Sequence, residues 1–376
     1  MQNKGYSVLY DVWRVYIFPH SLKPFAAAYC YTKGSMKDNT HLYAIARSLL
    51  TPGKGILAAD QSASTMNKQL AEIGAQQDAE TRRQYRQVLF TTPGLQDYVT
   101  GVILYDATIR NCTDDDTPFV DLLISKGIVP IIKVDGSTID HNGFPGEVVT
   151  QGMDNLGERL AEYYNMGARA AKWRAVFTIG PDYPSEQNIV YDCVMLARYA
   201  QLCHENGIVP IVEPEVIFKG NHDIGRAEAV TTQVLQKMFE LLVWYKVDLK
   251  AVILKSSFVL AGSDASAQST PEEVGAATVR TFENTVPHDI PGIVFLSGGQ
   301  TPERATANLD AVADIEKSRG NLPWQFAFSY SRGLEDPVQK AWQGKKENVP
   351  AAQEALIKRL RLNTTADTGE YTPEME

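Results

Sequence analysis

The amino-acid sequence predicts a single-domain α/β protein with a (β/α)₈ barrel of the TIM type. A short apolar run, a polar or charged tip and a longer segment with helical spacing recur eight times along the chain. The runs are nearly continuous in apolar residues, which is typical of parallel strands that are buried on both faces. No linker rich in Pro, Gly or Ser divides the repeats, and barrels of this length commonly form one domain.

The predicted strands follow one another at intervals of roughly thirty to forty-five residues, as in a closed barrel. They cover residues 56–60, 101–106, 129–135, 170–174, 209–215, 251–257, 292–299 and 325–330. Helix starts lie between them, because Thr270 heads a capping box with Pro271 at the first helical position and Thr301-Pro302 begins in the same way. An open doubly wound sheet is the alternative, but no G-x-G-x-x-G follows the first run.

The N-terminal segment does not share this pattern. Residues 1–35 are rich in aromatic side chains without a clear period, and Asp11 and Arg14 interrupt any apolar core of a signal peptide. We expect them to form a poorly ordered extension, with the natural start near Met36, and residues 36–376 to form the barrel and a C-terminal tail.

Composition narrows the function classes. The formal net charge of −9 argues against nucleic acid or an anionic membrane as a partner, since both require basic patches. No stretch of eighteen apolar residues predicts a transmembrane helix. The four cysteines, Cys30, Cys112, Cys193 and Cys203, form no C-x-x-C pair and indicate a reduced, cytoplasmic protein.

Charged and small polar residues gather at the carboxyl ends of the predicted strands, where barrel enzymes carry their active sites. These residues are Asp60, Asp106, Asp135, Lys172, Arg174, Glu213, Glu215, Lys255, Ser297, Gly298, Gly299, Ser329 and Arg332. Side chains two apart on a strand share a face, so Lys172 with Arg174 and Glu213 with Glu215 form one cluster of opposite charges. A purely structural salt-bridge network is the alternative, but it gives no reason for all the charges to lie at one end.

Lys255 is the predicted nucleophile. It ends an apolar run, and burial together with the nearby ammonium of Lys172 favours the neutral amine, which can attack a carbonyl to form a Schiff base. Glu213 is placed to transfer protons, and Asp60 is a second acid–base candidate. The Schiff base acts as the electron sink, so we expect neither a cofactor nor a metal.

The histidines agree with a metal-free mechanism, since a zinc-dependent enzyme would need several of them in the barrel mouth. All six histidines lie away from the strand ends, and none belongs to an H-E-x-x-H pattern. A phosphate site is expected instead after the seventh and eighth strands, at Ser297-Gly298-Gly299 and at Ser329 with Arg332. Residues 296–300 spell LSGGQ, but no Walker A loop supports a transporter ATPase.

The strand-end motifs resemble those of class I fructose-bisphosphate aldolases, in a bacterial-like form with a short tail. The resemblance runs from about Leu42 to the C-terminus and comprises residues 53–60 (GKGILAAD), 171–174 (AKWR), 212–215 (VEPE), 254–255 (LK), 295–299 (FLSGG), 328–330 (FSY), 341–345 (AWQGK) and 369–373 (GEYTP). It implies a lyase of glycolysis and gluconeogenesis that cleaves fructose 1,6-bisphosphate, and a homotetramer.

The resemblance also implies a role for each site residue. Lys255 forms the Schiff base, Glu213 accepts and donates protons, Asp60 and Lys172 assist at the carbinolamine and carbon–carbon steps, and Glu215 and Arg174 hold the charges in place. The ketose and its 1-phosphate are expected to bind Ser297, Gly298, Gly299, Ser329 and Arg332. Ser62 and Thr65 are two further residues expected to bind the substrate.

The sequence departs from the family pattern in several places. Gln69 and Cys112 replace basic residues, Gln61 and Ala107 replace acidic ones, Ser256-Ser257 and Ser331 also differ, and the C-terminal Tyr of the animal enzymes is missing. We expect the losses to gather at the 6-phosphate end of the substrate, with Lys68 and Arg110 nearby as compensating cations. Two other functions therefore stay open, a Schiff-base aldolase for another ketose phosphate such as fructose 1-phosphate, and a non-catalytic barrel scaffold.

Overall fold

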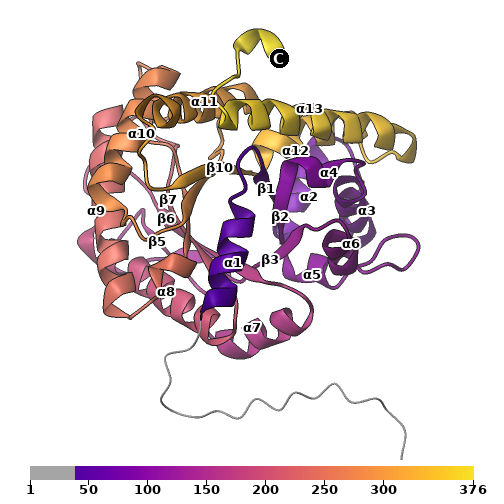
Figure 1. Ribbon diagram of the computed structural model, residues 1–376, viewed down its shortest axis with the longest axis horizontal. Helices are drawn as coiled ribbons and strands as arrows, with labels where there is room; N and C mark the ends of the chain where they lie inside the picture. Colours follow the sequence, from indigo (N-terminus) through magenta and orange to yellow (C-terminus); the bar gives the residue numbers. More distant parts are fainter. Residues whose placement is uncertain (1–38) are drawn as a thin grey trace, which may run out of the picture. The chain divides into compact units, whose positions relative to one another are not determined.

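The computed structural model describes residues 39–376, and within them eight parallel strands close into a barrel (Figure 1). The order around the barrel is β1-β10-β9-β8-β7-β6-β3-β2. This closed sheet confirms the predicted (β/α)₈ fold. The expected extension at residues 1–35 and the proposed start at Met36 lie outside the described residues.

Each barrel strand overlaps one of the predicted runs. The strands are β1 (Gly55–Ala59), β2 (Val99–Leu104), β3 (Val129–Lys133), β6 (Ala170–Phe177), β7 (Val209–Val216), β8 (Ile253–Ser256), β9 (Gly292–Phe295) and β10 (Gln325–Tyr330). The seventh run was predicted to extend to residue 299, but β9 ends at Phe295. Gly298 and Gly299 have φ of +58° and +89°, a left-handed backbone that a strand cannot continue.

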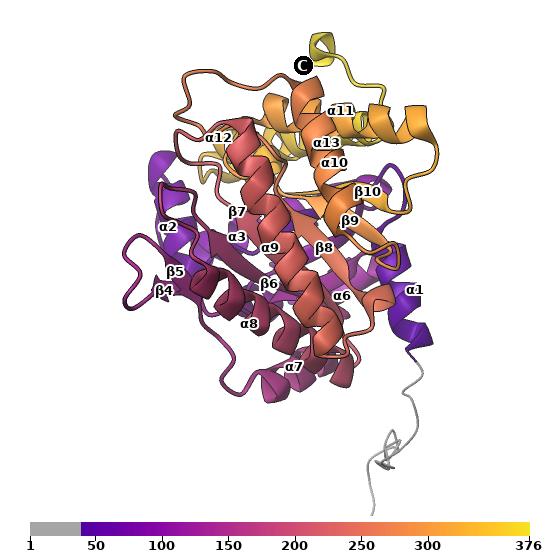
Figure 2. The same ribbon diagram turned by 90° about the vertical axis from the view of Figure 1, so that its left-hand side faces the viewer.

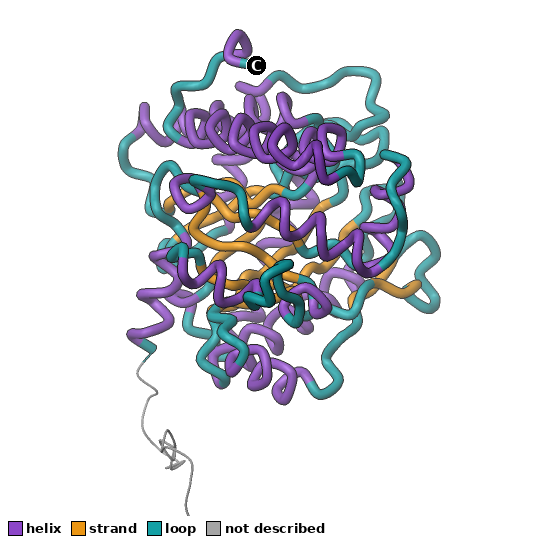
Figure 3. The backbone as a smooth tube through the Cα atoms, turned by 90° about the vertical axis from the view of Figure 1, so that its right-hand side faces the viewer, coloured by secondary structure: helices purple, strands orange, loops and turns teal. Residues whose placement is uncertain are grey.

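Helices surround the barrel on the outside (Figure 3). They are α1 (Thr40–Leu49), α2 (Ala63–Glu72), α3 (Ala79–Phe90), α4 (Leu95–Tyr98), α5 (Asp106–Ile109), α6 (Phe119–Ser125), α7 (Leu156–Asn165), α8 (Glu186–Glu205), α9 (Ile224–Trp244), α10 (Pro271–Thr285), α11 (Pro302–Arg319), α12 (Arg332–Trp342) and α13 (Val349–Asp367), with short 3₁₀ turns η1 (Leu249–Ala251), η2 (Lys346–Asn348) and η3 (Pro373–Met375). The two predicted helix starts are correct. Thr270 forms a full capping box with Glu273, and Thr301 caps α11 with Pro302 at the first position.

One helix closes the end of the barrel where the strands begin. In Figure 1, α1 crosses the middle of the ring, and its buried residues Leu42, Ala46 and Leu49 join a separate apolar cluster with inward-facing strand residues. Glycines make room for it, because a Cβ on Gly101 would lie 2.7 Å from Leu49 Cδ2. With this end filled, the opposite end, where the strands finish, is the one that can bind a ligand.

Two further features lie outside the ring of strands. A small antiparallel hairpin, β4 (Thr138–Asp140) and β5 (Val148–Thr150), precedes α7 and was not predicted; Figure 2 shows it near the long helix α8. The C-terminal α13 packs against α11 and α12. Among residues 39–376, no helix is both long enough and apolar enough to span a membrane.

Candidate active site

The carboxyl ends of the strands surround a cavity of about 230 Å³. Its wall contains all the residues predicted to react or to bind the ketose and its 1-phosphate except Gly299, namely Asp60, Ser62, Thr65, Lys172, Arg174, Glu213, Glu215, Lys255, Ser297, Gly298, Ser329 and Arg332. The strand-end residues Asp106 and Asp135 are not part of the wall. The predicted residues of the wall come from six of the eight strands or from the segments that follow them, and they meet at one place, as the strand-end pattern predicted.

Lys172 lies at the centre of the charged cluster, in contact with three carboxylates. Its Nζ lies 2.8 Å from Asp60 Oδ2, 3.0 Å from Glu213 Oε2 and 4.0 Å from Asp135 Oδ2. The side chain extends from β6, whose register sets Lys172 beside Lys133 of β3 and Ile211 of β7. Lys172 is only 4% exposed, so these contacts are made with little water present.

Lys255 shares one carboxylate with Lys172. Its Nζ lies 3.2 Å from Glu213 Oε1, while Lys172 contacts the other oxygen of the same group. Lys255 is near the end of β8, where Ile253 and Leu254 before it are fully buried. Glu213 is therefore within proton-transfer distance of the Lys255 amine, the geometry required of a general base.

The charges of the cluster support one another. Burial raises the pKa of Glu213 and of Asp60, but the ammonium groups of Lys172 and Lys255 outweigh it, and both pKa values are lowered. Burial in turn lowers the pKa of Lys172, and the carboxylates of Asp60, Glu213 and Asp135 outweigh it, so this pKa is raised. The cluster therefore favours ionised carboxylates at Asp60 and Glu213 and a charged Lys172, which can orient a polar substrate.

A second ion pair closes one side of the cavity. The Nε of Arg174 donates to Glu215 Oε2, and burial, which lowers the pKa of Arg174, is outweighed by Glu215, so that this pKa is raised. One charged residue of the cavity wall, Lys133, was not predicted from the sequence. Lys133 lines the cavity and contacts Asp135 Oδ1 at 3.2 Å. Their positions two residues apart at the end of one predicted strand were the available signal.

The residues predicted to bind phosphate after β9 and β10 lie together in the cavity wall. Ser297 and Ser329 are buried, and Ser329 Oγ has no hydrogen-bond partner among the described residues. α12 begins at Arg332, and the backbone N–H of Gly333 donates to Ser297 Oγ at 3.4 Å. Hydroxyl groups, a helix N-terminus and a guanidinium therefore lie close together, and groups of these kinds commonly bind phosphate and other oxyanions in proteins.

Gly299 contributes to this site without lining the cavity. A Cβ at this position would lie 2.9 Å from Arg332 Nη2. The glycine therefore leaves the space that the guanidinium occupies, and its φ of +89° shapes the turn.

The far side of the cavity differs from the prediction. Gln69, Cys112, Lys68 and Arg110 are all absent from the cavity wall. Arg110 is paired with Asp106 at 2.9 Å and Glu162 at 2.6 Å, so its charge is neutralised elsewhere.

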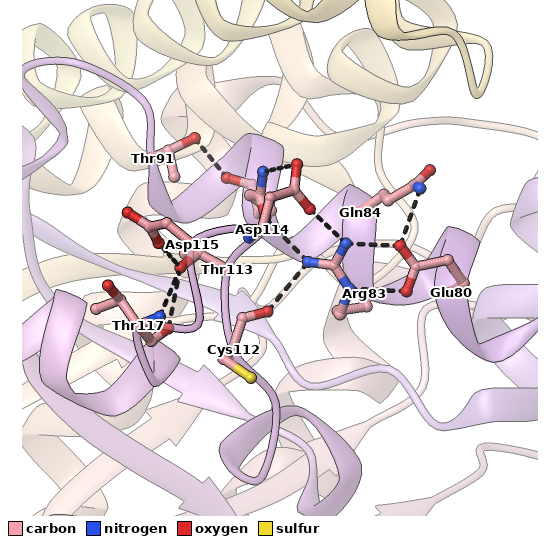
Figure 4. Close-up of polar contacts among 10 residues, drawn as sticks. Glu80, Arg83, Gln84, Thr91, Cys112, Thr113, Asp114, Asp115 and Thr117 are labelled. Atoms are coloured by element: carbon pink, nitrogen blue, oxygen red, sulfur yellow. Dashed lines mark hydrogen bonds and ion pairs between the residues drawn. The ribbon is translucent and has the colours of Figure 1, made fainter.

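Cys112 belongs to a cluster outside the cavity, which Figure 4 shows. Arg83 is its centre, donating to the carbonyl oxygen of Cys112 at 3.0 Å and pairing with Glu80 and Asp114, each at 2.6 Å.

Lys133 is the cation on the far side instead. Its strand β3 is four strands away from β9 in the closed order of eight, and so lies across the barrel from Ser297.

Within residues 39–376, no group of three or more His, Cys, Asp or Glu side chains is arranged to hold a metal ion.

Most of the chain matches proteins of one family. Residues 41–376 match the family model described as fructose-bisphosphate aldolase class-I. The chain is 47% identical over 330 residues to fructose-bisphosphate aldolase 6, cytosolic, of Arabidopsis thaliana, covering 88% of this chain and 91% of that protein. It is 46% identical over 327 residues to a probable fructose-bisphosphate aldolase class 1 of Xanthomonas axonopodis pv. citri (strain 306), covering 87% and 97%.

A solved structure is similar to the whole barrel. Fructose-bisphosphate aldolase from Plasmodium falciparum, crystallised in complex with TRAP and a small-molecule inhibitor, superposes with a TM-score of 0.86 at 41% identity. The match covers 89% of this chain and 96% of that one.

Proposed function

The chain belongs to the class-I fructose-bisphosphate aldolase family, and we propose that it reversibly cleaves fructose 1,6-bisphosphate into dihydroxyacetone phosphate and glyceraldehyde 3-phosphate through a Schiff base on Lys255. The observation that carries the proposal is the 3.2 Å contact between Lys255 Nζ and Glu213 Oε1 inside the cavity. A buried amine beside a carboxylate has a route by which to lose and regain protons.

The first half of the reaction joins substrate to enzyme. The Lys255 amine, after passing a proton to Glu213, attacks the C2 carbonyl of the ketose, and the carbonyl oxygen becomes a hydroxyl. Protonation of that hydroxyl by Glu213 releases water and leaves an iminium ion. Lys172 and Asp60, 2.8 Å apart, stabilise the oxygen while its charge changes.

The second half breaks the carbon–carbon bond. Removal of the proton from the C4 hydroxyl by Glu213, with Asp60 assisting, forms the aldehyde as the C3–C4 bond breaks. The electron pair moves into the iminium, giving an enamine that needs no metal as an electron sink. Protonation at C3, followed by addition of water to the imine, releases dihydroxyacetone phosphate. Arg174 and Glu215 keep the surrounding charges in place.

The two phosphates of the substrate are proposed to bind at opposite ends of the cavity. The 1-phosphate is proposed to bind Ser297, Gly298, Ser329 and Arg332, with Gly299 leaving room for the guanidinium. The 6-phosphate is proposed to extend across the barrel toward Lys133, with the hydroxyls of Ser62 and Thr65 in the wall.

Fructose 1-phosphate is the second candidate substrate. This substrate is favoured by the contact of Lys133, the cation across the barrel, with Asp135 at 3.2 Å. The nearby carboxylate weakens the attraction of Lys133 for a second phosphate. A non-catalytic scaffold is disfavoured, because it has no use for a buried lysine and carboxylate in a cavity.

Cellular setting and assembly are also proposals. Related proteins carry the names cytosolic and cytoplasmic, and the described cysteines Cys112, Cys193 and Cys203 are free thiols, which supports a cytoplasmic enzyme of glycolysis and gluconeogenesis. The homotetramer of the family resemblance is supported by Val243 and Trp244, which are 60% and 71% exposed at the end of α9. Sedimentation measurements test the assembly.

A cleavage assay with both sugars tests the function. The wild type should cleave fructose 1,6-bisphosphate, and Lys255→Met should abolish cleavage while the circular dichroism spectrum stays native. Lys237→Met, on the surface of α9, is the matched control and should keep full activity. Cleavage of neither sugar by the wild type would refute the proposal, and equal efficiency on both would assign the chain to the second candidate.

A further inference from the structure

Glu335 is a buried carboxylate that the proposed mechanism does not use. Its side chain is 0% exposed and lies outside the cavity wall, in the first turn of α12. Its ion-pair partner is Arg86 of α3, 3% exposed, with Nη1 3.4 Å from Glu335 Oε2. A charge pair this deeply buried is costly to desolvate, so it indicates a specific task.

Gln61 links this pair to the active site. Its Nε2 donates to Glu335 Oε1 at 3.0 Å and to Ser331 Oγ at 2.7 Å, and its Oε1 accepts from Arg86 Nη2 at 2.5 Å. A carboxylate can only accept and a guanidinium can only donate, so the amide of Gln61 has a single satisfactory orientation. That orientation directs its second N–H to Ser331.

Both ends of this link belong to the cavity wall. Gln61 directly follows Asp60, and Ser331 directly precedes Arg332; all four residues line the cavity. The cluster therefore joins the end of β1 to the first turn of α12, whose Gly333 N–H reaches Ser297.

We propose that Glu335, with Arg86, is a positioning residue that acts through Gln61 and Ser331 to hold Arg332 and the start of α12 at the phosphate end of the site. The inference rests on the proposed function, because it assigns a substrate phosphate to this end. Glu335 itself does not touch the substrate. Its loss should weaken phosphate binding more than it slows the chemistry at Lys255.

The titration of Glu335 offers an independent readout. Burial raises the pKa of Glu335 to about 7, although Arg86 and hydrogen bonds from Gln61 and Tyr85 oppose this. The charge of Asp60 raises the pKa further. The carboxylate should therefore lose its charge as the pH falls through about 7, and with it the ion pair to Arg86.

The experiment uses the full chain with Glu335→Gln and with the exchange Gln61→Glu/Glu335→Gln. The single variant leaves Arg86 without a carboxylate and the Gln61 amide without a fixed orientation. We expect KM for fructose 1,6-bisphosphate and for fructose 1-phosphate to rise at least about tenfold, the scale of one charge-assisted contact, with kcat within about threefold. The exchange returns one carboxylate to the same hydrogen bond, and KM should return to within about twofold of the wild type.

Glu316→Gln is the matched control, because Glu316 is a partly buried carboxylate on α11 outside the cavity, with its pKa likewise raised to about 7 by burial. Its KM should equal that of the wild type. Between about pH 8 and pH 6, the KM ratio of Glu335→Gln to wild type should fall, because the wild-type carboxylate is then protonated.

Three results would overturn the inference: wild-type KM in Glu335→Gln, no recovery in the exchange variant, or a KM ratio that does not change with pH. Loss of the borohydride-trapped adduct with dihydroxyacetone phosphate in Glu335→Gln alone would also overturn it, by placing Glu335 in the chemistry. A wild type that forms no adduct and cleaves neither sugar is a different result, which refutes the proposed function.

Discussion

Lys172→Met tests the electrostatic account of the site through the stability of the protein. Methionine keeps most of the bulk of the side chain and removes the charge that lies 2.8 Å from Asp60 and 3.0 Å from Glu213. Glu213 retains Lys255 at 3.2 Å, so Asp60 is the carboxylate left without a close cation. The variant should also lose most of its aldolase activity.

The magnitude follows from the burial of the cluster. Removing one member of a buried ion pair typically costs about 3–5 kcal/mol of unfolding free energy. Because Glu213 keeps its second lysine, we expect a loss near the lower limit, about 3 kcal/mol. This is a large part of the roughly 5–15 kcal/mol by which proteins are stable.

The loss should depend on pH in a defined direction. The folded-state pKa values of Asp60 and Glu213 are lowered, so their contribution to stability is present above their usual values of 3.8 and 4.5 and is lost in acid. The pKa of Lys172 is raised, so its contribution is present below its usual 10.5 and is lost in strong alkali. The difference between wild type and variant should therefore be full at neutral pH and shrink below about pH 4.

Urea unfolding followed by circular dichroism measures both effects. The midpoint difference multiplied by the m value gives the lost free energy at pH 7.5 and at a series of acid pH values. Lys237→Met, which removes a surface ion pair with Glu240, is the control and should shift the midpoint little. A loss below about 1 kcal/mol at neutral pH, or a loss that stays constant in acid, would refute the reasoning.

Three further predictions concern the two phosphate ends and the absence of a metal. Lys133→Met should raise KM for fructose 1,6-bisphosphate about tenfold while KM for fructose 1-phosphate stays unchanged; equal effects on both sugars would place Lys133 elsewhere. Gly299→Ala should raise KM for both sugars, because the added Cβ would lie 2.9 Å from Arg332 Nη2. Gly320→Ala is the control: Gly320 also has a positive φ, +64°, but a Cβ there would have no atom within 4 Å, and KM should not change. Turnover should be the same with and without EDTA, and a loss of activity that zinc restores would contradict a metal-independent mechanism.

The sequence was sufficient to predict the barrel because the fold depends on local signals that repeat. Apolar runs such as those around Leu254 and Ile293 identify buried strands, and Thr270 and Thr301 mark helix starts that the structure retains. Since all parallel strands of a closed barrel end at the same side, the strand-end residues had to meet, and the cavity contains all but Gly299 of those predicted to bind or react.

The rest depended on which distant residues become neighbours, and the sequence does not contain that information directly. The closure of one barrel end by α1 depends on Leu49 fitting against Gly101. The Glu335–Arg86 pair joins residues 249 positions apart in the chain.

The error at the far side of the cavity has the same origin. Cys112 and Arg110 are close in sequence to the end of β2, but the loop carries them outward to Arg83 and Glu162. Lys133 was overlooked because it lies within a predicted strand, two residues before the terminal Asp135.

The central claim is the covalent role of Lys255, and reductive trapping tests it most directly. The wild type is incubated with dihydroxyacetone phosphate and borohydride, digested, and the modified peptide is sequenced by mass spectrometry. We expect one adduct, on Lys255, that disappears in Lys255→Met while the fold is retained. An adduct on Lys172, Lys133 or any other lysine, or no adduct in an enzyme that cleaves the sugar, would contradict it.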